Sequence, residues 1–329
     1  MLKTFVFVGN TKIGNELVPN LLEAGFKAAE GLESADVIFT FTSFLDDTEE
    51  VYFGSEGMIA SAKAGAYLVN LSPATPSLTH EIYALAQVSN MYAVDAPLFV
   101  HDAGREHAFA DKANLSIFVG GTEGNLAQVK PMLDALAEDV VACGDAGRGQ
   151  LAKAAASLQR CASVVGLIEA DSLLRVAESD EVAATLVARS LAAGVNSAEL
   201  ANYYAAVVGR SMESSYSADI MLGEIVAALS AADDMQLILP QAESAEYLLQ
   251  LLCTIGGVEK STAALALMYA DEAECARYGL DWTRAETAFD SFDEDECDHD
   301  HDHDHDHGHH HKQDHEHRHF GEEDMFGLN

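Results

Sequence analysis

A short apolar segment that runs into a glycine turn and then a helical pattern constrains the fold of this chain more than any other feature. Residues 4–8 read TFVFV, which predicts a buried strand, and a helix is predicted from about Ile13 to Ala24. The turn between them, Gly9 to Gly14, reads GNTKIG. A strand, a glycine turn and a helix in this order are typical of a dinucleotide-binding unit, where the helix start receives a pyrophosphate.

Two departures weaken this dinucleotide signal. Thr11 stands where the second glycine of such a turn lets the pyrophosphate approach the backbone, and its β-carbon crowds the phosphate. After the helix, the chain reads AGFKAAEGLESADVIFTF and passes to the next apolar strand without an intervening one. We therefore expect one strand–helix unit to be missing, and Glu30, Glu33 and Asp36 to be surface acids instead of ribose ligands.

The pattern of the remaining chain divides it into two ordered parts and a tail. Strands predicted at Val37–Thr42, Ala66–Asn70, Met91–Val94 and Leu115–Val119 alternate with helical segments, which predicts a mostly parallel sheet with helices on both faces. After Gly149 only helices are predicted, at Gln150–Glu178, Val182–Ala193, Ser197–Met212, Ala218–Ala231, Gln241–Cys253 and Ser261–Tyr278. We expect an α/β Rossmann-like domain at 1–146, an all-α domain at 147–285 that also forms a homodimer or larger oligomer, and a tail at 286–329.

The tail carries a metal-binding pattern and no apolar periodicity, so we expect it to be disordered. Imidazoles alternate with aspartates, and neutral imidazole is a ligand for divalent nickel, zinc, copper and cobalt. A solvated tail with only incidental metal affinity is the alternative. The candidate metal ligands are His299, His301, His303, His305, His307, His309, His310, His311, His315, His317 and His319.

Charge and composition exclude some classes of partner. The formal net charge is −36, and the 15 acids and 2 bases from Asp290 onward contribute −13 of it. An acidic body repels phosphate backbones, so nucleic acid is not expected as a partner. No run of about 18 apolar residues predicts a membrane span. The start of the chain lacks a signal-peptide pattern and the five cysteines are scattered, which favours a cytoplasmic protein with reduced thiols.

Several motifs occur in an order that resembles the β-hydroxyacid dehydrogenase family, which includes 3-hydroxyisobutyrate and 6-phosphogluconate dehydrogenases. The resemblance runs from Met1 to about Trp282. The glycine turn leads into the helix end Leu21-Leu22-Glu23-Ala24-Gly25, and Ala35–Ile38 matches the family's A-D-V-I strand. The remaining motifs are Asn70–Pro76 for D-x-S-T-x-x-P, Asp95-Ala96-Pro97 with Gly120-Gly121 for D-A-P-V-S-G-G, and Gly147–Lys153 for G-x-G-x-x-x-K.

This resemblance implies an NAD- or NADP-dependent oxidoreductase that acts on a small hydroxy acid or related carbonyl. It assigns Lys153 as the general acid and base, a task that partial burial favours because burial lowers a lysine pKa; an exposed lysine is the alternative. It assigns substrate contacts to Ser72, Ser157 and His101. Arg105 and His107 share the His101 loop. One of its histidines could replace a lost polar contact, and Arg105 could meet a substrate carboxylate; an exposed loop without such a role is the alternative. The implied cofactor residues are Gly9, Asn10, Thr11, Lys12, Ile13, Gly14, Phe41, Thr42, Ser43 and Asn70.

The chain also departs from the family where substrate is bound. Phe99-Val100-His101 stand in place of the family's S-G-G, and Ser157 in place of its asparagine. Its later K-D pair aligns with Gly223-Glu224, so a second cation is absent. Three functions therefore remain open: a nicotinamide-dependent oxidoreductase, a non-catalytic binding protein with the same fold, and a metal buffer acting through the tail.

Overall fold

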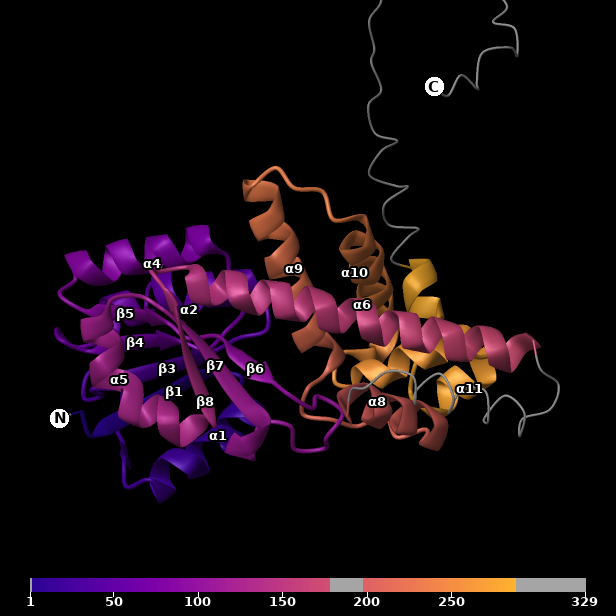
Figure 1. The fold of residues 1–329 in the computed structure, drawn as a ribbon, viewed down its shortest axis with the longest axis horizontal. Helices are drawn as coiled ribbons and strands as arrows, with labels where there is room; N and C mark the ends of the chain where they lie inside the picture. The colour runs from indigo at the N-terminus through magenta and orange to yellow at the C-terminus, as the bar shows by residue number, and fades with distance from the viewer. Residues whose placement is uncertain (1, 178–197, 288–329) are drawn as a thin grey trace, which may run out of the picture. The chain divides into compact units, whose positions relative to one another are not determined.

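The computed structural model describes residues 2–177 and 198–287, so the predicted helix at Val182–Ala193 and residues 288–329 of the tail lie outside the described residues. Residues 1–287 form one compact unit. Among the described residues, all strands lie in the first half of this unit and the elements of the second half are helical, as Figure 1 shows. The expected α/β fold with a helical second part is confirmed, whereas the domain boundary at residue 146 stays a prediction.

The strands form one sheet in the order β2-β1-β3-β4-β5-β7-β6, and β8 pairs with β7. The first five strands in this order are parallel, β7 runs antiparallel to β5 and β6, and β8 runs parallel to β7. The sheet is therefore mostly parallel, as expected. The strands are β1 Thr4–Gly9, β2 Lys27–Ala28, β3 Val37–Phe41, β4 Tyr67–Asn70, β5 Tyr92–Asp95, β6 Leu98–Val100, β7 Leu115–Gly120 and β8 Asp139–Gly144.

The second strand corrects one expectation. Lys27–Ala28 pairs in parallel with β1 through Thr4 and Phe5, so the strand that was expected to be missing is present in two residues. Both of its residues are exposed at the sheet edge, and so it has no apolar pattern that sequence analysis could detect. The next residues, Ala29 to Asp36, form turns and bends without a helix, so only the helix of this unit is missing.

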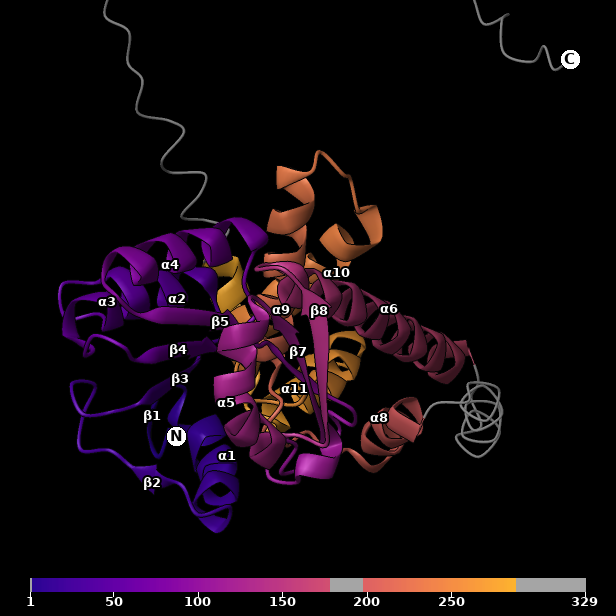
Figure 2. The same cartoon turned by 60° about the vertical axis from the view of Figure 1, so that its left-hand side comes forward.

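Helices cover both faces of the sheet, which Figure 2 shows most clearly. One buried cluster packs α1 and α5 on the sheet through residues such as Leu17, Leu21 and Met132, while a second packs α2, α3 and α4 through Tyr52, Met58 and others. These helices are α1 Thr11–Glu23, α2 Leu45–Phe53, α3 Met58–Ser61, α4 Pro76–Val88 and α5 Glu123–Leu136.

The second half is built around α6, Arg148–Ala177, which runs from the sheet into the helices (Figures 1 and 2). The first buried cluster continues from the strands into these helices, so the two halves share one apolar core. The segment predicted as one helix at Ser261–Tyr278 is instead two pieces, because the chain leaves the helical conformation at Ala270. The elements are α8 Ala198–Gly209, α9 Ala218–Asp234, α10 Pro240–Leu252, the π-turn η2 Cys253–Gly257, the 3₁₀ segment η3 Thr262–Tyr269 and α11 Glu272–Arg277.

One segment of α6, Arg148–Arg175, is long and apolar enough to cross a bilayer by length and composition. In the structure, however, this helix packs against β7 and α9. It also buries Lys153 and Arg160, each paired with a carboxylate of the same chain. Buried paired charges are what a core helix of a folded protein shows, and we interpret α6 as such a helix.

Candidate active site

The predicted cofactor residues meet at the carboxyl edge of the sheet. Gly9 lies beside Phe41 in the strand register, and Thr40 lies beside Asn70. The segments after these strands are tied together, since the backbone amide of Asn10 donates to the carbonyl of Phe41 at 2.7 Å. The backbone amide of Thr42 donates to Ser72 Oγ at 2.9 Å. Residues from three loops thus share one site, at the edge where α/β sheets bind their ligands.

The glycine turn has two of the features that a dinucleotide needs. Gly9 has φ +104°, a conformation that side chains disfavour. A β-carbon on Gly14 would lie 2.7 Å from the ring of Phe7, so this glycine allows α1 to pack closely on β1. The first and third glycines therefore have the geometry that the sequence predicted, and Thr11 is exposed at the helix start.

The side chain of Asn10, the residue before α1, caps the start of this helix. Asn10 Oδ1 accepts from the backbone amides of Lys12 at 3.0 Å and Ile13 at 3.2 Å. These are among the amides that a phosphate at this helix start would receive. The Asn10 side chain therefore competes with a pyrophosphate for the same donors.

Lys153, Ser157 and Glu224 form a buried polar group between α6 and α9. Lys153 Nζ lies 2.6 Å from Glu224 Oε1, and Ser157 Oγ donates to Glu224 Oε2 at 2.6 Å. All three residues are at most 3% exposed. Burial lowers the pKa of Lys153 to about 8, although Glu224 raises it. Burial raises the pKa of Glu224, but Lys153 and Arg160 outweigh burial and hold it below its ordinary value.

The first turn of α6 is fixed against two strand ends. Gln150 holds the segment after β4, because its Nε2 donates to the carbonyl of Ser72 at 3.0 Å and its Oε1 accepts from the amide of Ala74 at 2.9 Å. Asp95, at the end of β5, lies beside this turn. Burial raises its pKa to about 6, while the backbone amides of Gly147 and Gly149 lower it. The segment that carries Lys153 is thereby held at the sheet edge.

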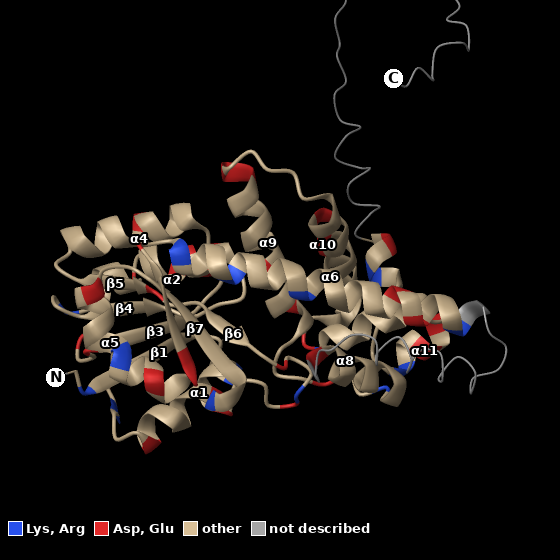
Figure 3. Ribbon diagram, viewed as in Figure 1, with Lys and Arg blue, Asp and Glu red and all other residues tan. Residues whose placement is uncertain are grey.

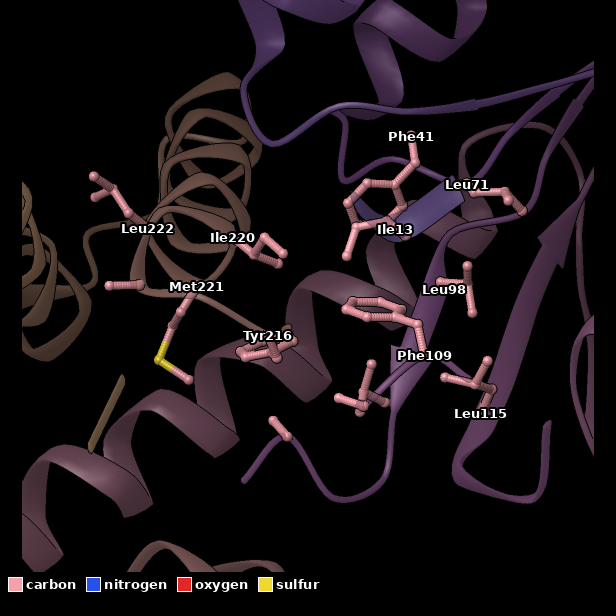
Figure 4. Packing of buried hydrophobic residues seen from close by; sticks show 14 of the residues in the cluster. Ile13, Phe41, Leu71, Leu98, Phe109, Leu115, Tyr216, Ile220, Met221 and Leu222 are labelled. Atoms are coloured by element: carbon pink, nitrogen blue, oxygen red, sulfur yellow. The ribbon is translucent and has the colours of Figure 1, made fainter. Parts of the chain in front are cut away.

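The site is closed by direct contact between the sheet loops and α9. Ser43 Oγ donates to Asp219 Oδ2 at 2.9 Å. A β-carbon on Gly223 would collide with the backbone carbonyl of Ser43. Figure 4 shows Ile13 and Phe41 of the cofactor edge packed in the same apolar cluster as Ile220 of α9. In this arrangement α9 contacts the loop after β3 directly.

A second contact closes the same side. Glu16, on α1, accepts from the backbone amide of Phe109 at 2.9 Å and from Ser215 Oγ at 3.0 Å. These two partners lie in the loop after β6 and in the segment before α9. Lys12 adds an exposed ion pair with Glu259 at 3.5 Å. These contacts join α1 to the loop after β6 and to the segment before α9.

The loop after β6 carries His101, Arg105 and His107 at the protein surface. His101 is exposed, and its Nε2 lies 2.9 Å from Ser116 Oγ. Arg105 is paired with Asp102 and Asp111, each at 3.3 Å. His107 is exposed beside Glu16. The polar groups of this loop thus bind neighbouring protein groups, and a substrate role for His101 stays a prediction.

Sequence reasoning missed four residues of this site. Glu224 was aligned with the family's K-D pair but was given no role of its own. Gln150 is a variable position of the Gly147–Lys153 motif, and Glu16 belongs to no motif. Arg160 lies on the same helix face as Lys153. The seven-residue spacing of Lys153 and Arg160 was the one available signal, since it places two cations on one stripe of a helix.

The metal prediction falls on residues 299–319, outside the described part of the chain. Across residues 2–177 and 198–287, no group of three or more His, Cys, Asp or Glu side chains is arranged to hold a metal ion. Four cysteines within these ranges, Cys143, Cys161, Cys253 and Cys275, are free thiols, two of them buried.

The sequence of this chain is similar to those of known proteins. Residues 5–144 match the family model of the NAD binding domain of 6-phosphogluconate dehydrogenase. The chain is 31% identical over 194 residues to the uncharacterized oxidoreductase YkwC of Bacillus subtilis, covering 52% of this chain and 66% of that protein. It is 27% identical over 252 residues to a probable mitochondrial 3-hydroxyisobutyrate dehydrogenase-like 1 protein of Arabidopsis thaliana, covering 75% and 73%.

The fold has a counterpart among solved structures. The crystal structure of a 3-hydroxyisobutyrate dehydrogenase from Salmonella typhimurium superposes with a TM-score of 0.67 at 19% sequence identity. The superposition covers 81% of this chain and 99% of that one. At this identity the match shows a shared fold.

Proposed function

Because this chain belongs to the family of 3-hydroxyisobutyrate and 6-phosphogluconate dehydrogenases, we propose that it is an NAD- or NADP-dependent oxidoreductase. It would exchange a hydride between the nicotinamide and a small hydroxy acid or related carbonyl. The observation that carries this proposal is the buried Lys153, whose amine is held beside the carboxyl edge of the sheet with its pKa lowered to about 8.

The residues at the sheet edge fit a dinucleotide in part. Gly9 and Gly14 provide the turn and the close packing that a pyrophosphate site needs. Glu30, two residues beyond β2, is exposed, in line with the surface acid expected from the sequence. The loops at Phe41–Ser43 and at Asn70–Ser72 would flank the nicotinamide half.

Lys153 supplies the proton chemistry in this proposal. The cofactor, when bound, donates or accepts the hydride. As a cation, Lys153 donates a proton to the carbonyl oxygen during reduction, and as a neutral amine it removes the hydroxyl proton during oxidation. Ser157 fixes the second oxygen of Glu224, and Glu224 in turn holds the Lys153 amine in place.

A second candidate function is a non-catalytic binding protein on the same fold. Two contacts favour it: Ser43, assigned to the cofactor site, is bonded to α9, and the Asn10 cap uses an amide that a pyrophosphate would receive. This candidate predicts no affinity for either nicotinamide cofactor.

We propose in addition that the tail binds divalent ions such as nickel or zinc through its eleven histidines. The partners would be a small-molecule substrate and these ions, without nucleic acid or membrane. The scattered cysteines, with no C-x-x-C pair, favour a cytoplasmic protein. Exposed apolar side chains at Met235, Leu237 and Ile238 support a homo-oligomer formed through the helical half.

The full chain titrated with NADH and with NADPH, followed by cofactor fluorescence, separates the first two candidates. The oxidoreductase predicts saturable binding of one cofactor and its oxidation by an aldehyde or ketone. Lys153→Met should keep the cofactor binding and lose at least a hundredfold in turnover, the scale of general acid catalysis. Absence of binding by both cofactors would support the non-catalytic candidate.

A further inference from the structure

The aromatic ring of Phe99 covers two buried cations of α6. Phe99 is on β6, and its ring centroid lies 4.2 Å from Arg160 Cζ and 5.3 Å from Lys153 Nζ. Lys153 and Arg160 share one face of α6, and Figure 3 shows basic positions spaced along this helix. An uncharged ring therefore occupies a face of each cation that an anion would otherwise approach.

Both cations are already neutralised by carboxylates. Lys153 pairs with Glu224 at 2.6 Å and Arg160 pairs with Glu199 at 2.7 Å. Arg160 also donates to the carbonyl of Val100. The cluster thus holds two positive and two negative groups, and its net charge is zero.

The arginine of the nearest loop is already paired with carboxylates. Arg105 divides its guanidinium between Asp102 and Asp111. A substrate carboxylate would therefore leave water for a neutral site, where Glu224 repels it, and would have to displace a partner that is already in place. Burial of a charge without a free partner costs several kcal/mol. An uncharged carbonyl needs only one donor for its oxygen, and the Lys153 ammonium, which has three N–H groups, can provide it beside its bond to Glu224.

We propose that the substrate of this protein is an uncharged aldehyde or ketone, not a carboxylate-bearing hydroxy or oxo acid, and that Phe99 is the residue that sets this preference. The inference rests on the oxidoreductase function proposed above. A reduced nicotinamide transfers a hydride to the carbonyl carbon, the carbonyl π electrons move to oxygen, and the Lys153 ammonium protonates it. The products are an uncharged alcohol, the oxidised nicotinamide and a neutral lysine that regains its proton from water.

A matched pair of substrates tests the proposal: 4-oxobutanoate and its methyl ester share one reacting aldehyde and differ in charge. The full-chain protein is assayed with NADH and NADPH after its cofactor affinity has been measured by fluorescence. The ester should have a kcat/KM at least tenfold above that of the acid. Equal or better reduction of the acid, or reduction of neither by cofactor-loaded protein, overturns the proposal.

The Phe99 assignment is tested by two serine variants on adjacent strands. Phe99→Ser uncovers the cations and should lower the ester-to-acid ratio at least threefold. Phe118→Ser removes the ring that packs on Phe99 at 5.8 Å and should leave the ratio unchanged. Equal shifts in both variants overturn the role of Phe99. Phe99→Leu, which keeps an apolar cover, should keep the wild-type preference even if the serine variant fails to fold.

Failure to bind either cofactor removes the proposed oxidoreductase function and this inference with it, whereas cofactor binding with preference for the acid removes this inference alone.

Discussion

Gly223 on α9 and Ser43 after β3 meet backbone to backbone, so close that a β-carbon on Gly223 would collide with the Ser43 carbonyl oxygen. The hydrogen bond from Ser43 to Asp219 seals the same contact. The two residues are 180 positions apart in the sequence, and their contact joins the cofactor edge of the sheet to the helical half. A side chain at residue 223 would hold these two parts apart.

Gly223→Ala should therefore destabilise the closed protein. Overpacking of this kind costs typically 1–3 kcal/mol, and we expect a loss of about that size in the free energy of unfolding, measured with urea. Gly166→Ala on α6 is the matched control, since a β-carbon there meets no neighbouring atom within 4 Å. The control should be neutral or stabilised by up to about 1 kcal/mol, because alanine favours a helix over glycine. Equal effects of the two substitutions would show that the contact with Ser43 is unimportant.

Lys153 and Glu224 should be strongly coupled in stability. Lys153→Met leaves the Glu224 carboxylate buried without its cation, a loss that typically costs about 3–5 kcal/mol. The double variant Lys153→Met, Glu224→Gln removes both charges and should be more stable than the sum of the single variants by roughly 1–3 kcal/mol. Urea unfolding of the four proteins measures this coupling. Strictly additive effects would contradict the buried ion pair.

Asp95 should make stability depend on pH in the acidic range. Its pKa rises from 3.8 to about 6 in the folded protein, so the folded state holds a proton that the unfolded state has lost between these values. The resulting stabilisation is complete below about pH 4 and disappears as pH rises through 6, an effect of at most about 3 kcal/mol.

Asp95→Asn should remove this dependence. The stability of the wild type relative to the variant should decrease between about pH 4.5 and pH 7, as determined from urea midpoints. The exposed Asp47→Asn in the first turn of α2 serves as the control and should give a constant difference. A wild-type advantage that grows with pH would mean that the Asp95 carboxylate is stabilised by the fold.

The sequence predicted the parts of the fold whose pattern is local. The strands at Val37–Phe41 and Tyr67–Asn70 are fully buried apolar runs, and α6 is a long helix after a glycine turn, so each was placed within a few residues. By contrast, β2 is two exposed residues that are a strand only because β1 lies beside them. Long-range pairing defines such a strand, and no local pattern can reveal it.

For the same reason, only part of the candidate site could be predicted from the sequence. Lys153 follows a recognisable glycine pattern, whereas its partner Glu224 lies 71 residues later in an apolar helix. The closure at Gly223 depends on a backbone approach across the fold, and a glycine in a helix gives no sign of what it approaches. These residues form a site because the fold brings them together, and their residue types alone do not indicate it.

Thr11 and Asn10 should both limit cofactor affinity. Thr11→Gly removes the β-carbon that crowds the phosphate, and we expect an affinity for NADH or NADPH at least threefold higher by fluorescence titration. Asn10→Ala frees the backbone amides of Lys12 and Ile13 to bind a phosphate. It also removes the cap of α1, which should lower the stability of the protein by about 1 kcal/mol. Thr11→Ser, which keeps a β-carbon, is the control and should bind like the wild type. If all of these proteins fail to bind, the non-catalytic candidate is favoured.

The tail should bind several divalent ions independently of the rest of the chain. Affinity should be higher for copper and nickel than for cobalt, following the general order for nitrogen ligands, and calorimetry measures it. Binding requires neutral imidazole, so it should weaken as pH falls through about 6.5, the ordinary imidazole pKa.

A variant with the eleven tail histidines replaced by glutamine keeps the carboxylates and should lose this nickel affinity. Removal of residues 290–329 should abolish it as well, while the melting temperature of the body should stay within about 2 °C because the tail has no apolar pattern that would add to the core. Undiminished nickel or zinc affinity in the truncated protein would instead place the metal site in the body.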